Sequence, residues 1–449
     1  MRPGPTLRAT AVGATALIAL FALEYIAVGA AMPTVAAALD GFALYNMAFG
    51  ATVAASVVGM VVGGWWSDRS GPRPVVQAGT LAFAGGLVVA GLAPTMEIFV
   101  SGRAFQGLGS GLATVALYVV IAQLVPDDRR PFVFSLLAAA WVVPGLVGPL
   151  FTGAMVEYLS WRWVFLSVPP LVVLALAVLR PALRGTHPSS EAPYLRPATI
   201  GWAVVAAAAV GLLNLSGERI DGIEWVVGPV VLALLALAAW QLLPPGTLTL
   251  ARGLPSVVGV RAAVGGSFVA AEAYLPLMLQ DQYAYSPAQA GAVLAAASIA
   301  WALGSFVQGR LGPGTDRYRV MLVGVLLYVS LMGVLAFAVG SSWPGWVVIG
   351  IYGLATIGVG LAYPTTSLLT MRLSPPAEIG KNSSSLQVGE ALASAFALAV
   401  TGVVFGLTYA AAPGAAFVGT LSVAFVVGAL AVVSAGRART PAAPGTNPG

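Results

Sequence analysis

The chain contains 449 residues, of which 59% are hydrophobic and only 8% are charged, and its mean hydropathy is +0.91. A soluble domain carries about 25% charged residues, so this composition excludes a sizeable soluble domain and predicts a polytopic membrane protein. The formal net charge of +5 does not indicate nucleic-acid binding, because the basic residues stand singly or in pairs beside apolar runs, where they act as topology signals.

Six apolar runs are predicted in the first part of the chain, each long enough to cross a hydrocarbon core ~30 Å thick. The first run, 11–32, follows Arg2 and Arg8. It is longer than the apolar core of a usual signal peptide and contains Glu24 near its middle, so we interpret it as a retained span. The other five runs are 44–66, 75–92, 96–124, 132–156 and 164–179.

A polar linker follows, in which Arg184, His187 and Pro188 belong to a composition that cannot form a packed core. Two further runs, 200–215 and 225–243, are predicted to cross the membrane as an extra pair. The turn between them has an excess of acid, which indicates the external side; its charged residues are Glu218, Arg219, Asp221 and Glu224. If the pair lies on the surface instead, the number of spans falls from about fourteen to about twelve without changing the topology.

Six more runs complete the pattern, at 257–279, 288–307, 320–339, 347–369, 384–407 and 415–433. Threading the spans in this order places all but four of the 21 basic residues on one side, which is therefore predicted to be cytoplasmic, as are both termini. The four exceptions are Arg103, Arg162, Arg219 and Arg261.

This threading predicts four segments. Residues 1–180 are expected to form an N-terminal six-helix bundle, and residues 181–256 a cytoplasmic linker that carries the extra pair. Residues 257–436 are expected to form a C-terminal six-helix bundle, and the Pro- and Gly-rich residues 437–449 a disordered cytoplasmic tail.

A charged turn, residues 63–74, separates the second run from the third. It contains Gly64, Asp68, Arg69, Gly71 and Arg73. The glycines let one helix end and the next begin within a few residues, and the aspartate can accept hydrogen bonds from free backbone N–H groups. The arginines hold the turn in the cytoplasm. A weaker copy at 308–319 indicates two halves built on one plan.

The fourth and fifth runs carry two further motifs. Arg103 begins the sequence Arg-Ala-Phe-Gln-Gly-Leu-Gly, and an arginine inside hydrocarbon costs at least ~2.5 kcal/mol unless it is paired or hydrated. The alternative is that Arg103 reaches the outer interface and only anchors its helix. In the fifth run, Gly148, Pro149 and Gly153 predict a kinked helix rich in small residues, for which a close packing surface is one interpretation.

Glutamates inside predicted spans are the most informative residues. Glu24, Glu272 and Glu390 would each cost a few kcal/mol as carboxylates in lipid, so each must be paired, face a wet cavity or be protonated. A carboxylate whose proton affinity depends on its surroundings can take up a proton on one side and release it on the other. The alternatives are a static pair between Glu24 and an arginine such as Arg103, and extension of Glu390 to the cytoplasmic rim.

Polar residues recur at helical spacing in the run 384–407 and just before it, namely Ser383, Gln387, Glu390, Ser394 and Thr401, and they predict one stripe that faces an aqueous path. We expect Gln106, Gln387 and Ser394 to line a substrate cavity. Proton coupling is expected to involve Glu24, Arg103, Glu272 and Glu390.

Several chemistries are not expected. The sequence has no cysteine and a single histidine, and it contains neither a Gly-x-x-x-x-Gly-Lys-Ser/Thr loop nor a Gly-x-Ser-x-Gly elbow. These features argue against an enzyme, an ATPase and a metal site. Energy is then expected to come from an ion gradient, with no cofactor.

Three motifs resemble those of the major facilitator superfamily. The charged turn is similar to the family's Gly-x-x-x-Asp-Arg-x-Gly-Arg/Lys loop, although Pro72 stands where the family often has a basic residue. Residues 103–109 are similar to its Arg-x-x-Gln-Gly-x-Gly pattern. Residues 144–153 resemble its antiporter motif, with Pro144 and Thr152 in place of glycine, and this resemblance implies a gating role for Gly148, Pro149 and Gly153. With the extra pair, the chain resembles the fourteen-span drug:proton antiporter group.

The resemblance implies an all-α major facilitator fold of two six-helix bundles and a central pair. It further implies proton-coupled export of small lipophilic or cationic compounds by rocking of the two halves, in the cell membrane, by a protein expected to be a monomer. Asp68 and its arginines would help to latch one conformation. Two alternatives keep this architecture: a transporter for a dedicated endogenous metabolite or lipid, and a non-transporting membrane sensor or scaffold.

Overall fold

The computed structural model describes residues 5–41, 44–189, 197–215, 224–312 and 314–439. Within these ranges the regular elements are α-helices and one short 3-10 helix, without strands. The predicted acidic turn at Glu218, Arg219 and Asp221 and the predicted disorder after Arg439 lie outside the described residues.

Seven helices make up the N-terminal half. They are α1 Pro5–Ala38, α2 Tyr45–Ser70, α3 Pro72–Gly91, α4 Met96–Leu124, α5 Arg130–Tyr158, α6 Trp161–Leu166 and α7 Val168–Leu183. Helices α6 and α7 follow one another directly and form one apolar span, Trp161–Leu183. This half therefore contains six spans, as the sequence predicts.

The extra pair and the C-terminal half follow. The extra pair consists of α8 Pro197–Leu215 and α9 Glu224–Leu242. The C-terminal half consists of α10 Leu254–Tyr283, α11 Pro287–Arg310, α12 Arg317–Gly340, α13 Gly345–Leu373, the 3-10 helix η2 Pro376–Glu378, α14 Ile379–Thr408 and α15 Pro413–Arg437. The all-helical fold predicted from the sequence is confirmed.

Twelve helices of the described chain are long and apolar enough to cross a membrane. The helices of the extra pair are also apolar but shorter, with apolar stretches at Pro197–Leu212 and Gly228–Leu242. The structure is thus consistent with the predicted range of about twelve to fourteen spans.

Local sequence signals explain where several helices begin. The Ser286 hydroxyl accepts a hydrogen bond from the Gln289 N–H, and the Gln289 side chain accepts one from the Ser286 N–H, which together form a capping box at the start of α11. Asp316 caps α12 by accepting from the backbone N–H groups of Tyr318 and Arg319. Between α2 and α3, Gly71 adopts φ +79°, which favours glycine.

Small residues let helices within one half approach closely. A Cβ atom at Gly79 of α3 would lie 2.7 Å from the carbonyl oxygen of Gly109 in α4, so these backbones pack directly against each other. Large buried side chains fill the rest of each half, such as Phe83 and Phe165 in the N-terminal half and Tyr328 and Phe417 in the C-terminal half.

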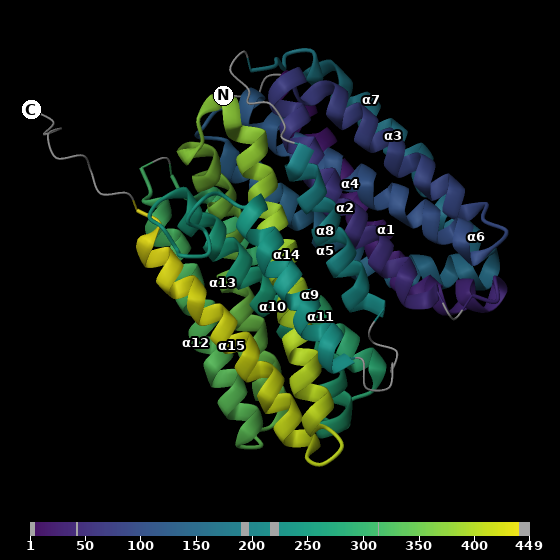
Figure 1. The fold of residues 1–449 in the computed structure, drawn as a ribbon, viewed down its shortest axis with the longest axis vertical. Helices are drawn as coiled ribbons and strands as arrows, with labels where there is room; N and C mark the ends of the chain where they lie inside the picture. The colour runs from purple at the N-terminus through teal and green to yellow at the C-terminus, as the bar shows by residue number, and fades with distance from the viewer. Residues whose placement is uncertain (1–4, 42–43, 190–196, 216–223, 313, 440–449) are drawn as a thin grey trace, which may run out of the picture.

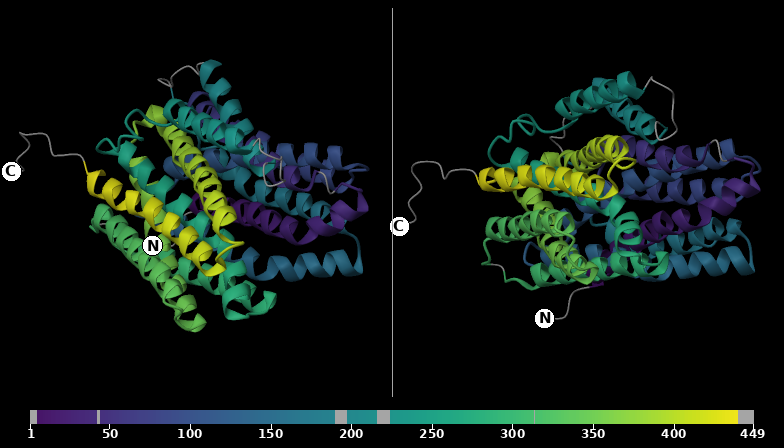
Figure 2. Two further views of the ribbon diagram at one scale, coloured as in Figure 1. Left: turned by 60° about the horizontal axis from the view of Figure 1, so that its bottom comes forward. Right: turned by 90° about the horizontal axis from the view of Figure 1, so that it is seen from below.

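The two halves lie side by side and the extra pair lies along one flank (Figures 1 and 2). Between the halves, α2 and α4 contact α14, and α5 contacts α11 and α13. Helix α8 packs on α2, and α9 packs on α8 and α14. A separate apolar cluster unites these elements, with Val57, Ala206, Leu235 and Leu386 among its buried members. The extra pair therefore contacts both halves at the seam between α2 and α14.

Candidate functional site

A cavity of about 550 Å³ lies between the two halves. Its walls come from α1, α2, α4 and α5 on one side and from α10, α11, α13 and α14 on the other. Most of the lining is apolar or aromatic, and the charged side chains in it are Arg261, Glu272 and Glu390. An apolar hollow with a few charged groups has the composition of a small-molecule site.

Glu272 projects from α10 into this cavity and is partly exposed. Among the described residues its carboxylate has no hydrogen-bond or ion-pair partner. Four residues later Pro276 lies inside α10, which continues to Tyr283. Because proline has no N–H, the backbone carbonyl of Glu272 lacks its usual helical donor. In the described part of the chain, Glu272 thus lacks an ion-pair partner for its carboxylate and the Pro276 N–H for its backbone carbonyl.

Aromatic side chains from the N-terminal half also line the cavity. Tyr25 of α1 and Trp141 of α5 pack edge to face with ring centroids 6.2 Å apart, and Phe21 lies one helical turn before Tyr25. Aromatic faces attract cations, most strongly where water is excluded. The cavity therefore offers both a carboxylate and aromatic surfaces to a positively charged ligand.

Arg261 and Glu390 form an ion pair at the cavity wall, between α10 and α14. Arg261 Nε lies 2.6 Å from Glu390 Oε2, and Arg261 Nη1 donates to the backbone oxygen of Tyr363 at 3.2 Å. The Tyr363 hydroxyl donates to Glu390 Oε1 at 3.0 Å, and the guanidinium carbon lies 3.7 Å from the centre of the Tyr363 ring. The Arg261 and Glu390 side chains keep 10% and 26% of their surface exposed. This pair is in contact with the cavity and does not extend to the rim.

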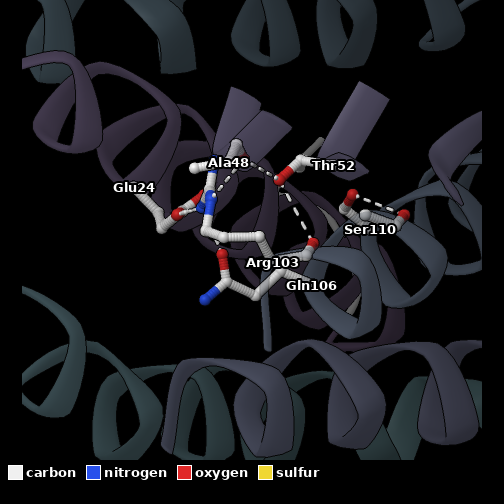
Figure 3. A network of polar contacts seen from close by, with 7 residues as sticks. Glu24, Ala48, Thr52, Arg103, Gln106 and Ser110 are labelled. Atoms are coloured by element: carbon white, nitrogen blue, oxygen red, sulfur yellow. Dashed lines mark hydrogen bonds and ion pairs between the residues drawn. The ribbon is translucent and has the colours of Figure 1, made fainter. Parts of the chain in front are cut away.

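Glu24 and Arg103 form a second ion pair, which is sealed inside the N-terminal half (Figure 3). Glu24 is 3% exposed and Arg103 is 1% exposed, and neither lines the cavity. Arg103 also donates to the side chain of Gln106 and, through Nε, to the backbone oxygen of Ala48 at 3.2 Å. The buried pair excludes the interfacial-anchor alternative for Arg103 in this conformation.

Gln106 does not line the cavity, contrary to expectation. Its side-chain oxygen accepts from Arg103, and the residue is fully buried. The reason is position along α4: Arg103 and Thr114 are eleven residues apart and share a face of the helix, which lines the cavity at Thr114. At the level of Arg103 and Gln106, Glu24 of α1 and Ala48 of α2 cover it. Gln106 therefore belongs to the sealed polar cluster.

The predicted polar stripe on α14 reaches the cavity only in its middle part. Gln387, Glu390 and Ser394 line the cavity. Ser383 is buried outside the lining, and Thr401 donates to the carbonyl oxygen of Ala397 in its own helix. Helical spacing gives one face of a helix, but the cavity covers only part of the length of that face.

The charged turn joins the two halves through Asp68. Its Oδ1 accepts from the backbone N–H of Gly380 at 2.7 Å, and its Oδ2 accepts from that of Lys381 at 2.8 Å. These N–H groups belong to the first turn of α14, where free donors and the helix dipole favour a negative charge. A Cβ at Gly64 would lie 2.7 Å from the Gly380 carbonyl oxygen, so the glycine permits this contact.

The other predicted gating residues lie in two places. Arg69 and Arg73 are exposed beside Asp68, at the same end of the molecule. In α5, which is helical throughout Arg130–Tyr158, Gly148 faces Ile26 of α1, and Gly153 faces open space. The side chain of Pro149 lies outside the described residues.

Sequence reasoning missed Arg261 and Tyr363. Arg261 could have been found, because it is a charge inside the apolar run 257–279, which is the signal that singled out Arg103. Tyr363 gives no comparable signal, since a tyrosine in an apolar run is unremarkable in a membrane helix.

Comparison with known proteins places these features in a family. The sequence matches the Major Facilitator Superfamily model over residues 14–398. It is 26% identical over 378 residues to the acurin A biosynthesis cluster MFS-type transporter of Aspergillus aculeatus, covering 79% of this chain and 67% of the relative. It is 25% identical over 407 residues to a probable multidrug-efflux transporter of Mycobacterium tuberculosis, covering 86% and 85%.

Some relatives are longer than this chain. An uncharacterized MFS-type transporter of Mycobacterium tuberculosis is 28% identical over 400 residues, and the match covers 84% of this chain but 56% of the relative. Among solved structures, the proton:xylose symporter XylE superposes with a TM-score of 0.67 and 17% identity, covering 95% of this chain and 94% of that one. At this identity the likeness concerns the fold alone. The family match over most of the chain and the shared helical architecture agree, and this multi-pass membrane protein belongs to the Major Facilitator Superfamily of transporters.

Proposed function

We propose that the protein is a proton-coupled exporter of small lipophilic or cationic compounds. The observation that carries this proposal is Glu272, a carboxylate without an ionic partner among the described residues, in an aromatic-walled cavity between the two halves. A carboxylate in such a site is costly to keep ionised without a counter-charge. It therefore favours binding either a cation or a proton.

Competition between substrate and proton for the Glu272 carboxylate couples export to proton uptake. A cationic substrate enters the cavity, pairs with the carboxylate and releases its proton; after the cavity opens to the other side, a proton takes the place of the substrate. Each transfer exchanges one positive charge for another at the same oxygen atoms, so the carboxylate is not left bare. The aromatic residues Tyr25 and Trp141 hold the lipophilic part of the substrate.

The two ion pairs have different roles in this proposal. Glu390 touches the cavity and can take up a proton if Arg261 remains held by the Tyr363 carbonyl and ring. The Glu24–Arg103 pair must first open, because it is sealed from the cavity. We assign Glu390 to the exchange of protons with the cavity, and Glu24 and Arg103 to a step that requires helices α1 and α4 to move apart.

Alternating access would use the contact between Asp68 and the start of α14 as a latch. The positive-inside pattern favours a cytoplasmic position for this end and for both termini, in the cell membrane. With the latch made, the halves also meet between α5 and α11, where a Cβ at Gly309 would lie 2.7 Å from Ser135 Oγ. The cavity is then closed toward the cytoplasm, and export requires the latch to break for loading.

Relatives support the assignment to drug efflux, and one supports an alternative. A similar protein of Mycobacterium tuberculosis is named a probable multidrug-efflux transporter, and one of Klebsiella pneumoniae a putative multidrug resistance protein. The Aspergillus relative is named for a biosynthesis cluster, which favours a dedicated metabolite as the second candidate substrate.

Transport by the purified protein in proteoliposomes tests the proposal. We expect a pH gradient to drive movement of tetraphenylphosphonium or ethidium, and the Glu272→Gln variant to lose gradient-driven transport. The control is Ser298→Ala, a change in the same cavity wall that removes no charge. Unaltered transport by Glu272→Gln would remove Glu272 from the mechanism. Movement of neither cation by the wild-type protein would favour the dedicated-metabolite alternative.

A further inference from the structure

The cavity has charged groups at two separate positions on α10. Arg261 and Glu272 are eleven residues apart, which is close to three helical turns, so both project from the same face of the helix. At a rise of about 1.5 Å per residue their backbones are roughly 16 Å apart along the axis. One wall of the cavity is thus basic near one end and acidic near the other.

A series of three packed aromatic rings extends from beneath Arg261 to Phe268, which lies one helical turn before Glu272. Phe268, between them on α10, packs edge to face on Trp301 at 5.0 Å between ring centroids. Trp301 packs on Tyr363 at 4.9 Å, and Tyr363 lies beneath the Arg261 guanidinium. All of these residues line the cavity. A flat aromatic ligand can therefore contact rings along most of the distance between the two charges.

Arg261 retains capacity to bind a ligand. Its guanidinium has five N–H donors, and its hydrogen bonds to Glu390 and to the Tyr363 carbonyl are made from Nε and Nη1. Glu390 is also held by the Tyr363 hydroxyl, so it can turn partly away from Arg261 while remaining bonded. An anionic ligand can then take its place beside the Arg261 donors.

Taken together, the geometry points to a substrate class. We propose that the cavity binds aromatic zwitterions, whose cationic group pairs with Glu272 and whose anionic group pairs with Arg261 along the Phe268–Trp301–Tyr363 series. The inference rests on the proposed function, because it places the substrate in the same cavity, but it adds an anionic group that a simple cation exporter does not require. Arg261 then becomes a specificity-determining residue.

Equilibrium binding in nanodiscs, followed by tryptophan fluorescence, tests the inference with three matched probes. The first is a rigid terphenyl with a trimethylammonium group at one end and a carboxylate at the other. The second is its methyl ester, which keeps the cation and the rings but has no anionic group. The third is the corresponding biphenyl zwitterion, whose charges are one ring closer. We expect the terphenyl zwitterion to bind at least about tenfold more tightly than the other two, because only this probe carries a carboxylate that reaches Arg261 while its cation pairs with Glu272.

Variants separate the two ends of the site. Glu272→Gln should weaken both the ester and the zwitterion, whereas Arg261→Gln should remove only the preference for the zwitterion. Because Arg261→Gln alone leaves Glu390 without its partner, the double variant Arg261→Gln/Glu390→Gln serves as a neutral version of the pair, in which no charge is left unpaired. Asp127→Asn, which removes an exposed carboxylate outside the cavity, should leave all three affinities unchanged.

Two outcomes would overturn the inference. Equal affinity for the zwitterion and its ester in the wild-type protein would show that Arg261 recognises no anion. A zwitterion preference that persists in the double variant would place the anion elsewhere. Either result leaves cation export intact if the ester binds in a Glu272-dependent way, whereas failure of the ester to bind would count against the proposed function itself.

Discussion

Arg261 and Glu390 face each other across the cavity wall, with Arg261 Nε 2.6 Å from Glu390 Oε2. The other intramembrane pair, between Arg103 and Glu24, is buried inside the N-terminal half. Each half thus has one ion pair that involves its first long helix, α1 or α10, but only the pair on α10 is in contact with the cavity. This difference in burial leads to different expectations for the two pairs.

Neutralising one member of the sealed pair should destabilise the protein strongly. Glu24→Gln leaves Arg103 as a buried charge with only neutral partners, and breaking a buried pair in this way costs about 3–5 kcal/mol. We expect a clear fall in the melting temperature of the purified protein, measured by tryptophan fluorescence. The double variant Glu24→Gln/Arg103→Gln should recover much of that loss. A single variant as stable as the wild-type protein would show that the pair contributes nothing to folding.

Neutralising Glu390 in the cavity pair, Arg261–Glu390, should destabilise the protein less than neutralising Glu24 does. Glu390 keeps 26% of its side chain exposed, so water in the cavity can solvate Arg261 when Glu390→Gln removes its counter-charge. We expect a smaller fall in melting temperature than for Glu24→Gln, together with loss of gradient-driven transport of a lipophilic cation. The prediction fails if Glu390→Gln destabilises the protein as much as Glu24→Gln does.

Asp68 should control which side of the cavity is open. Asp68→Ala removes the acceptor for two N–H groups of α14 and the charge beside the helix dipole, so the latch should open more often. Because the chain has no cysteine, Ser298→Cys in the cavity wall provides a single reporter. A membrane-impermeant thiol reagent applied from the side of the charged turn should label this reporter faster in the Asp68→Ala background.

The control for this experiment is Asp127→Asn, which removes an exposed carboxylate beyond the end of α4 that pairs with Arg130 and not with α14. Labelling should stay at the wild-type rate in that variant. Equal labelling rates in the Asp68→Ala and wild-type backgrounds would show that these hydrogen bonds do not hold the cavity shut.

The sequence predicted the helical fold and the importance of the intramembrane charges because both follow from local properties. The length and polarity of an apolar run give a span, and a charge within a run demands a partner, which correctly pointed to Arg103 as a partner for Glu24. What local properties do not give is which helices meet. The contact of Asp68 with Gly380 joins residues 312 positions apart, and no motif at either position names the other.

Which part of a helix reaches the cavity was equally beyond the sequence. Gln106 lies near Arg103 and Gln387 lies near Glu390, each inside an apolar run, yet Gln387 lines the cavity and Gln106 does not.

The contacts of the linker were also beyond the sequence. The Ser189 N–H donates to the Asp68 carbonyl at 2.9 Å, and His187 exchanges two hydrogen bonds with Gln123, so the linker is fastened to the charged turn. Its composition had suggested only a polar connection.

A disulfide across the seam should hold the two halves together. A Cβ at Gly64 would lie 2.7 Å from both the Cβ of Ser384 and the Gly380 carbonyl oxygen, and a disulfide needs about 3.5–4.5 Å between Cβ atoms. A separation of α2 and α14 by about 1 Å would relieve the clash and accommodate the bond. In the naturally cysteine-free chain, the double variant Gly64→Cys/Ser384→Cys should cross-link under mild oxidation and lose transport of a lipophilic cation. Reduction should restore transport, because the halves must separate at this seam during each cycle. Each single cysteine variant, treated with the same oxidant, is the control for the loss of glycine or serine. Full transport by the cross-linked protein would show that the halves do not part here.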